Sequence, residues 1–247
     1  MIDLTGVDLT LVWAALIALA AGILRGAVGF GSALLLVPIL SALYTPLHAV
    51  SFVLTLDCLV SLPLIPAAAK RASFRSIALL TLFALLGTLP GFYLLKTLDS
   101  NTVRVLTSTV AVGFAVIFLL SGILHKAGFR ISEWLGGILS GLFGGIGALT
   151  GPPVVLHYML KGTEAHAIRA NMIMYFLVID VVLAVIALGS FDHLNDLITP
   201  LVVMLVAILT GALIGQKIAF QGDMPWYKPV AVAVITFTAI SSLFLPV

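Results

Sequence analysis

Charged residues are scarce in this sequence. Of its 247 residues, 9% are Asp, Glu, Lys or Arg and 62% are hydrophobic, whereas about a quarter of the residues in an ordinary soluble domain are charged. This balance excludes a water-soluble globular domain. The 12 Lys and Arg residues leave a net charge of only +2 and form no basic stripe, so we expect no nucleic-acid partner.

Cysteine is almost absent as well, because Cys58 is the only one. One cysteine allows neither an intrachain disulfide nor a thiolate metal cluster, so we expect no metal and no redox cofactor. The sequence also lacks an HExxH motif, a GxSxG elbow, a Walker loop and paired carboxylates near a nucleophile. These absences predict a protein that is not an enzyme.

Long apolar runs, by contrast, fill the sequence. A helix needs about 20 mainly apolar residues to cross a bilayer. Runs of this kind predict an all-α integral membrane protein whose solvent is the lipid bilayer. They cover residues 9–43, 49–66, 77–95, 103–124, 134–160, 168–190, 198–217 and 229–246.

The eight runs divide into two similar sets of four. The run GILRGAVGFGSALLLVP begins at Gly22 and resembles GILSGLFGGIGALTGPP, which begins 115 residues later at Gly137. Internal repeats of this kind are common in secondary transporters. The sequence therefore predicts a duplication, with one repeat over residues 1–125 and a second over residues 126–247, which together form one transport domain.

The first run of each repeat is too long and too rich in glycine to be one continuous helix, because each interior glycine costs about 1 kcal/mol relative to alanine. We expect each run to break and to leave a second arm, residues 33–43 or 153–160. Arms of about 12–17 Å cannot cross a hydrocarbon core of about 30 Å. The predicted fold therefore has a Gly-broken first segment, re-entrant or split, and three transmembrane helices in each repeat.

The distribution of Lys and Arg supports this arrangement. If all eight runs crossed the membrane, five basic residues would lie on one side and six on the other. If both first runs return, nine lie on one side and only Lys96 and Arg104 on the other, as the positive-inside rule requires. Three crossings per repeat make the repeats inverted. In a bacterial inner membrane, both termini and the acidic loop around Asp192 and Asp196 are then expected outside the cytoplasm.

The two predicted breaks indicate a binding site. Non-helical backbone at membrane depth needs protein or a wet cavity around it, and the helix after each break presents free N–H groups suited to an anion. The alternative is that the glycines only allow helices to pack closely. Near the breaks, the candidate substrate-binding residues are Gly29, Gly31, Ser32, Gly144, Gly147, Thr150 and Gly151.

Three ionisable residues lie deep in apolar runs, where a charge is costly unless it is paired or hydrated. Arg25 is the only basic one, and we expect its guanidinium to contact the substrate rather than to form a structural ion pair. Asp57 and Asp180 lie in the second run of each repeat and are candidate proton carriers. Alternatively, they are partners of Arg25 or make structural hydrogen bonds.

His157 and Asn171 complete the candidate substrate-binding set. His157 follows the second break and can ionise near neutral pH, although a histidine in a helix interface is more often a packing residue. Asn171 begins the sixth run near Arg169, which we interpret as a determinant of topology.

The runs GAVGFGSALLLVP and GLFGGIGALTGPP are each followed by an HAV or HAI segment. In these features the sequence resembles the sulfite exporter TauE/SafE family of membrane anion transporters, over essentially the whole chain. The first break departs from the family, because it reads GFGSA instead of a Gly-Gly-Gly run and has Arg25 where a small residue is common.

The resemblance implies a secondary transporter, coupled to protons, for a small organic or inorganic anion such as sulfite or a sulfonate. The alternatives are a carboxylate or amino-acid permease on the same scaffold and a passive anion channel. The expected partners are the anion, protons and the lipid bilayer. The sequence does not indicate an oligomeric state.

Overall fold

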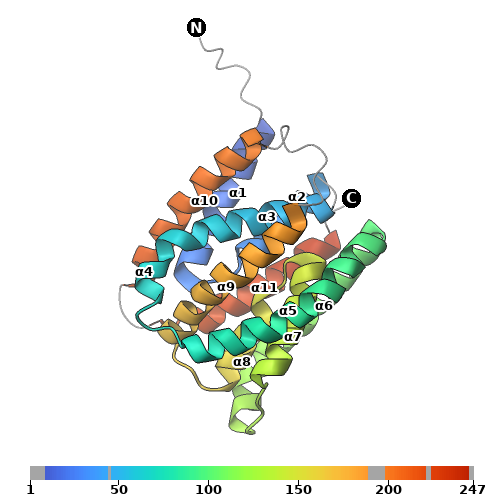
Figure 1. Cartoon of the computed structure of the whole chain (residues 1–247). Helices are drawn as coiled ribbons and strands as arrows, with labels where there is room; N and C mark the ends of the chain where they lie inside the picture. Colours follow the sequence, from blue (N-terminus) through green and yellow to red (C-terminus); the bar gives the residue numbers. More distant parts are fainter. Residues whose placement is uncertain (1–8, 44–45, 189–197, 221–223, 245–247) are drawn as a thin grey trace.

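The computed structural model describes residues 9–43, 46–188, 198–220 and 224–244. These residues form helices and contain no strand, which confirms the predicted all-α class (Figure 1). The elements are α1 (Leu9–Val28), α2 (Ser32–Leu43), α3 (Pro46–Ser61), the short 3-10 helix η2 (Leu62–Leu64), α4 (Ile65–Ala68), α5 (Phe74–Thr97), α6 (Ser100–Lys126), α7 (Glu133–Gly147), α8 (Gly151–Leu160), α9 (Ala165–Leu188), α10 (Ile198–Ala219) and α11 (Tyr227–Phe244).

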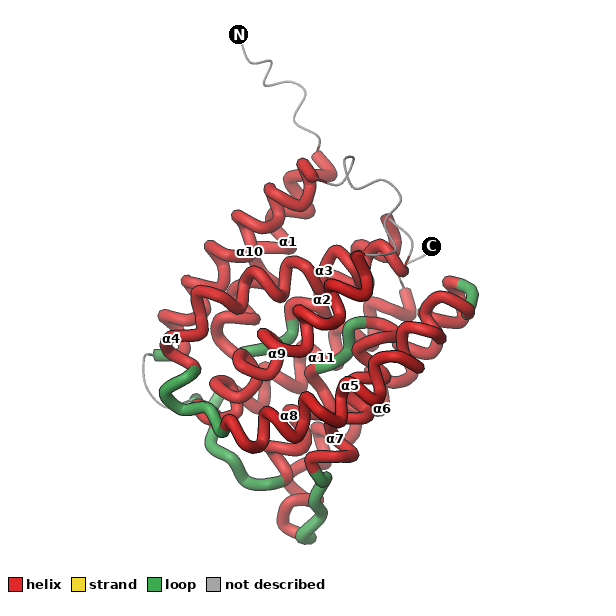
Figure 2. The backbone as a smooth tube through the Cα atoms, viewed as in Figure 1, coloured by secondary structure: helices red, strands yellow, loops and turns green. Residues whose placement is uncertain are grey.

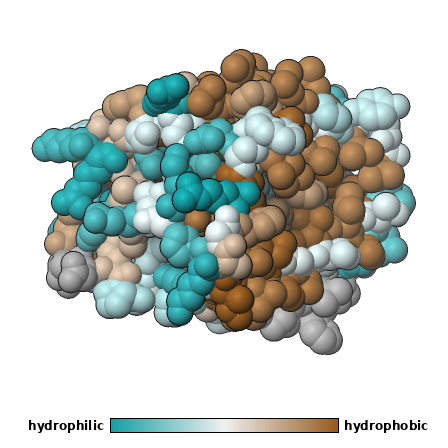
Figure 3. All heavy atoms as spheres, turned by 90° about the horizontal axis from the view of Figure 1, so that it is seen from below, coloured by the Kyte–Doolittle hydropathy of each residue, from teal (hydrophilic) through white to brown (hydrophobic). Residues whose placement is uncertain are grey.

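Six segments of the described chain are long and apolar enough to cross a membrane. Their outward faces are apolar, as at Leu86, Leu119 and Val206, whose exposed fractions are 63%, 62% and 61%. Seen from below, a broad hydrophobic surface lies beside a band of hydrophilic residues (Figure 3). A hydrophobic surface of this extent is suited to lipid. The chain is therefore a multi-pass membrane protein, as predicted. The acidic loop around Asp192 and Asp196 and both termini lie outside the described residues.

Local sequence explains where several helices begin. Gly151 is followed by Pro152 and Pro153 in the first turn of α8, where a missing N–H does no harm. Asp99 precedes α6 and accepts a hydrogen bond from the backbone N–H of Thr102, 3.0 Å away. The hydrogen bonds from Thr102 also hold the pKa of Asp99 below its ordinary value.

Both Gly-rich runs are broken, as the sequence predicts, and the two short loops lie in the middle of the molecule (Figure 2). After the breaks, α2 has 12 residues and α8 has 10, which correspond to about 18 and 15 Å at 1.5 Å per residue. Neither arm is long enough to cross the membrane. The first arms differ, because α1 has 20 residues and α7 has 15. At the same rise they reach about 30 and 22 Å, so only α1 matches a full hydrocarbon core.

The two breaks are not 115 residues apart, which is the spacing at which the two repeats resemble each other in sequence. The first break covers residues 29–31 and the second covers residues 148–150, which is 119 residues later rather than 115. Gly29 therefore lies in a break, whereas Gly144 lies inside α7, one turn before the break. The reason for the slip is that glycines spaced four residues apart lie on one helix face, so a shift of one turn matches almost as many of them.

Glycines also bring two pairs of helices into close contact. α1 packs along α10, and α7 packs along α5. A Cβ atom placed on Gly26 would collide with the backbone carbonyl of Ala212, and one on Gly141 would collide with that of Ala84. For these two glycines, the close-packing alternative is correct. In addition, α3 packs against α9, which brings together the second apolar runs of both proposed repeats.

Candidate functional site

Arg25 lies in the last turn of α1 and forms ion pairs with one carboxylate from each half of the chain. Its NH1 atom lies 3.5 Å from Oδ2 of Asp57 in α3, and its NH2 atom lies 3.3 Å from Oδ2 of Asp180 in α9. All three side chains are at most 2% exposed. Because an unpaired charge is very costly at this depth, the three side chains depend on one another.

Two serines extend this group. The NH2 atom of Arg25 donates to Oγ of Ser61 at 2.9 Å and to the backbone carbonyl of Asp57 at 3.4 Å. Ser32, the first residue of α2, donates to Oδ1 of Asp57. We call Arg25, Ser32, Asp57, Ser61 and Asp180 the central cluster. It connects the helix after the first break to α1, α3 and α9.

The two carboxylates of the central cluster have different partners. Asp57 receives a donor at each oxygen, from Ser32 and from Arg25. Oδ1 of Asp180 and Nε of Arg25 are buried and have no hydrogen-bond partner among the described residues. Buried polar atoms are normally paired, so the cluster has an unused acceptor and an unused donor.

The two breaks meet beside the central cluster. The Arg25 guanidinium carbon lies 4.1 Å from the centre of the Phe176 ring. A Cβ atom on Gly151, at the start of α8, would lie 3.3 Å from both Phe176 and Phe30, and Phe30 belongs to the first break. The N-terminal ends of α2 and α8 are therefore near the same two rings, close to the Arg25 guanidinium.

The backbone of the first break requires glycine. Gly29 and Gly31 have φ angles of +88° and +103°, in the left-handed region that disfavours other residues. In addition, a Cβ atom on Gly29 would lie 2.7 Å from the backbone carbonyl oxygen of Arg169. These two glycines shape the path of the chain, and their contact with a substrate remains a prediction.

The second break ends α7 with a left-handed residue that is not glycine. Ala148 has a φ angle of +55°, and its N–H donates to the carbonyl of Gly144 at 2.8 Å. The N–H of Leu149 donates to the carbonyl of Phe143 at 3.2 Å. The bond from Ala148 is that of an αL ending, and both bonds satisfy carbonyls that the end of a helix would leave open.

Hydrogen bonds inside the protein also hold Thr150. Its carbonyl accepts a bond of 2.6 Å from the hydroxyl of Ser140, which in turn lies 2.6 Å from the hydroxyl of Tyr175. The methyl group of Thr150 occupies the space where a Cβ atom on Gly144 would lie, and Gly147 faces Thr107 in the same way. No sequence pattern indicates Ser140 or Tyr175, because their partners belong to other helices.

Arg25 differs from its prediction in one respect. The sequence predicts a substrate contact rather than a structural ion pair, whereas Arg25 is paired with both Asp57 and Asp180. The structure therefore agrees with the alternative, in which these two acids are partners of Arg25. The physical reason is that no water reaches a fully buried guanidinium, so carboxylates must balance its charge. Contact with a substrate stays a prediction.

His157 and Asn171 are bonded elsewhere. Nδ1 of His157 lies 2.6 Å from the carbonyl oxygen of Ile131, and Nε2 lies 3.7 Å from Glu133 at the start of α7. Oδ1 of Asn171 accepts a bond of 2.7 Å from the backbone N–H of Ser73, just before α5. Their contacts are with the loops before α7 and α5, and the structure does not bring them into the central cluster.

Arg169 has a structural contact that the sequence did not suggest. Its Nε and NH2 atoms donate to the carbonyl oxygen of Gly26 at 2.8 and 2.6 Å. The last carbonyls of a helix have no partner within it, and a cation there also opposes the helix dipole. The end of a predicted helix implies unpaired carbonyls that need a donor. Nothing in the sequence identifies Arg169 as that donor.

The chain was compared with protein families, curated proteins and solved structures. The family model described as "Sulfite exporter TauE/SafE" matches residues 14–242. No curated protein and no solved structure matches.

Proposed function

The chain belongs to the sulfite exporter TauE/SafE family, and we propose that it is a proton-coupled secondary transporter of sulfite or a small sulfonate. The family and the six apolar helices make it a membrane anion transporter. The observation that carries the proposal of coupling is the buried central cluster, where one guanidinium faces two carboxylates.

The charge of this cluster links proton and anion. With both carboxylates ionised, Arg25, Asp57 and Asp180 carry a net charge of −1, which is costly at this depth and repels an anion. One bound proton brings the net charge to zero. It also weakens the hold of one carboxylate on the guanidinium, so that Arg25 can attract the substrate. Proton and anion therefore bind together, which is the basis of symport.

Hydrogen bonding favours Asp180 as the proton carrier. Asp57 has a donor at each oxygen, and such donors stabilise the ionised form. Asp180 has Arg25 at one oxygen and, among the residues that the structure describes, no partner at the other. We assign the proton to Asp180 and the permanent countercharge of Arg25 to Asp57.

The anion itself is placed beside Phe30 and Phe176. The N-terminal ends of α2 and α8 lie near these rings, and helix N-termini favour negative charge. Arg25 adds a full positive charge and an unused Nε donor. A guanidinium is suited to the oxygens of sulfite or a sulfonate. From the predicted set, we retain Arg25, Gly31, Ser32, Thr150 and Gly151 as substrate contacts.

Inverted repeats account for the helix contacts. If α1 to α6 correspond to α7 to α11, then α1 and α7 are equivalent, and so are α10 and α5. The pair α1 and α10 is then equivalent to the pair α7 and α5, and both pairs are packed together. The same exchange converts the contact of α2 with α11 into that of α8 with α6, which is also present. These contacts support a two-fold relation, and the charge distribution favours its inverted form.

Uptake into proteoliposomes tests this function. We expect sulfite or isethionate to accumulate only when an inward proton gradient is imposed. Asp180→Asn should abolish this accumulation and retain exchange of labelled for unlabelled anion, because exchange needs no net proton movement. Asp57→Asn is the matched variant and should impair both, since it removes the permanent countercharge of Arg25.

The outcomes separate the alternatives. Flux that ignores the proton gradient would indicate a passive channel. Accumulation of carboxylates or amino acids, without sulfite or sulfonates, would indicate the other permease. Full proton-driven uptake by Asp180→Asn would refute the assignment of the proton to that residue.

A further inference from the structure

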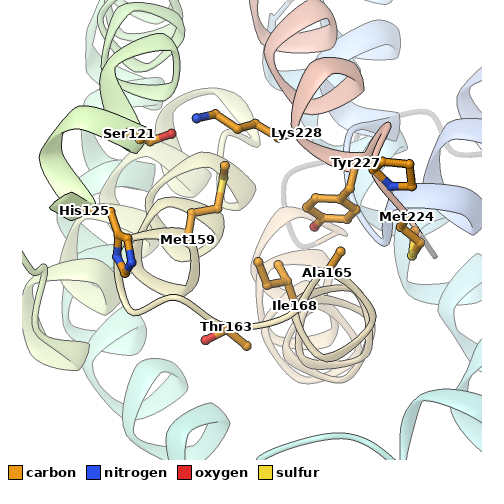
Figure 4. A pocket seen from close by; sticks show the side chains of 11 residues that line it. Ser121, His125, Met159, Thr163, Ala165, Ile168, Met224, Tyr227 and Lys228 are labelled. Carbon is orange, nitrogen blue, oxygen red and sulfur yellow. The ribbon is translucent and has the colours of Figure 1, made fainter.

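A pocket with several polar residues in its lining lies away from the central cluster, where the end of α6, the end of α8 and the starts of α9 and α11 meet. It has a volume of about 230 Å³. The polar residues that line it are Ser121, His125, Thr163, Tyr227 and Lys228 (Figure 4). Ile168 also lines it and precedes Asp180 by 12 residues on α9, which corresponds to about 18 Å along the helix. The pocket is therefore separate from the central cluster.

Lys228 is a cation available to a ligand. In Figure 4, its side chain reaches from α11 across the pocket towards Ser121 of α6. Its ammonium group lies 3.1 Å from the position that a Cβ atom on Gly122 would occupy, so the missing side chain leaves room for it. Among the described residues, Lys228 has neither an ion-pair partner nor a hydrogen bond. A half-buried ammonium without a partner favours an anion.

The hydroxyl group of Tyr227 is a second polar group without a partner in the described part of the chain. The side chain of Tyr227 is 3% exposed, and its hydroxyl has no hydrogen-bond partner among the described residues. Buried hydroxyl groups are normally satisfied. His125 stands across the pocket, with Nδ1 2.9 Å from the carbonyl oxygen of Leu160. Glu164 adjoins Thr163 in the sequence but does not line the pocket.

The remaining wall of the pocket is apolar and limits the shape of the ligand. It is formed by Met159, Ala165, Ile168, Met224 and Pro225. An inorganic ion would leave this wall without a contact. The volume is below the range of about 300–1,000 Å³ that is typical of pockets for drug-sized molecules, so the occupant is small.

We propose that this pocket is a second binding site for a small organic anion, with the acid group on Lys228 and a short hydrocarbon body against Met159 and Ile168. The site does not depend on transport through the central cluster. A phospholipid offers the same combination of an acid group and a short hydrocarbon body, at its phosphate and the adjoining glycerol. The experiment must therefore distinguish a free organic anion from a lipid head group.

A cysteine in the pocket gives a local measurement. Thr163→Cys in the Cys58→Ser protein, purified in detergent, is treated with methanethiosulfonate reagents that carry either an ethylsulfonate or an ethyltrimethylammonium group. We expect the anionic reagent to react about tenfold faster, as attraction by one partly buried ammonium allows, and isethionate to slow the reaction. Lys228→Gln should remove both effects, and Lys228→Arg should retain them.

Two matched variants make the result specific. Lys126→Gln removes a cation near the pocket that does not line it, and it should change neither effect. Asp180→Asn alters the central cluster, is expected to keep the protein folded, and should also leave both effects intact, so a failure of the proposed transport function would be distinguishable from a failure of this site.

Three results would overturn the proposal. The first is equal rates for the two reagents, the second is no protection by isethionate, and the third is unchanged protection in Lys228→Gln. Repeating the measurement in lipid nanodiscs identifies the source of the anion. If isethionate protects the cysteine in nanodiscs of phosphatidylcholine but not in nanodiscs of phosphatidylglycerol, the pocket binds a lipid head group. This result would also overturn the proposal.

Discussion

Arg25 is the residue on which the central cluster depends. It is fully buried, binds two carboxylates and stacks on Phe176. Removing one partner from a buried ion pair is far more harmful than replacing the whole pair, because the remaining charge is left without compensation. Arg25 therefore has a structural role whether or not it contacts the substrate.

We predict that Arg25→Gln lowers the free energy of unfolding by about 3–5 kcal/mol, because it leaves two buried carboxylates without a cation. Adding Asp57→Asn or Asp180→Asn should restore part of the loss. Thermal unfolding of the purified variants measures the change. Unaltered stability of Arg25→Gln would contradict the structural role.

Anion affinity of the same variants tests the substrate contact. Arg25→Lys retains the charge and loses the planar fork, whereas Arg25→Gln loses the charge, so Gln should weaken binding of isethionate more than Lys. The effect should appear in protein that is still folded. Normal affinity in Arg25→Gln would refute the contact.

At the scale of the elements, glycine faces decide how closely the helices approach. α7 lies so close to α5 that the position of a Cβ atom on Gly141 is already occupied by the carbonyl group of Ala84. Gly113 in α6 provides the contrast, because a Cβ atom there would meet nothing within 4 Å. The two glycines therefore predict opposite responses to the same substitution.

We predict that Gly141→Ala destabilises the protein by about 1–3 kcal/mol, since an added methyl group in a packed contact forces the helices apart. Gly113→Ala should be neutral or stabilising by up to about 1 kcal/mol, because alanine is the better helix former. Thermal unfolding of the two variants side by side is the measurement. A loss of equal size in both would show that packing against α5 is not the cause.

For the molecule as a whole, we expect the distribution of Lys and Arg to set the orientation in the membrane. If the first run of each repeat is a hairpin that returns to its own side, nine Lys and Arg residues lie on one side of the membrane. Only Lys96 and Arg104 lie on the other side. The positive-inside rule then predicts that the ends of α6 and α8 and the start of α11 lie on the cytoplasmic side. The pocket that contains Lys228, which these ends enclose, is expected to open to that side.

We predict that single cysteines at Lys161 and Lys228, in a Cys58-free protein, react with an impermeant reagent only from the cytoplasmic side. A cysteine at Asp192, outside the described residues, should react only from the other side, as should tags at both termini. Labelling of intact cells and inverted vesicles measures this. Reaction of Lys161→Cys and Lys228→Cys from opposite sides would exclude the hairpin arrangement.

Features that depend on neighbouring residues could be predicted from the sequence. Apolar runs indicated the membrane, glycine and proline indicated both breaks, and the rarity of intramembrane charge singled out Arg25, Asp57 and Asp180. These signals are local, because bilayer thickness and backbone conformation act on a short stretch of chain. The alignment of the repeats was displaced by one turn because glycine spacing is itself periodic.

Which of these residues come into contact depends on how the helices pack, and the sequence does not predict it. Arg25 and Asp180 are 155 residues apart, and the bond from Arg169 to Gly26 spans 143 residues. The same packing holds His157 and Asn171 at the loops before α7 and α5 rather than in the cluster. A buried polar group takes whichever partner the helix packing brings within reach, and that depends on the crossing of helices distant in sequence, which no local pattern specifies.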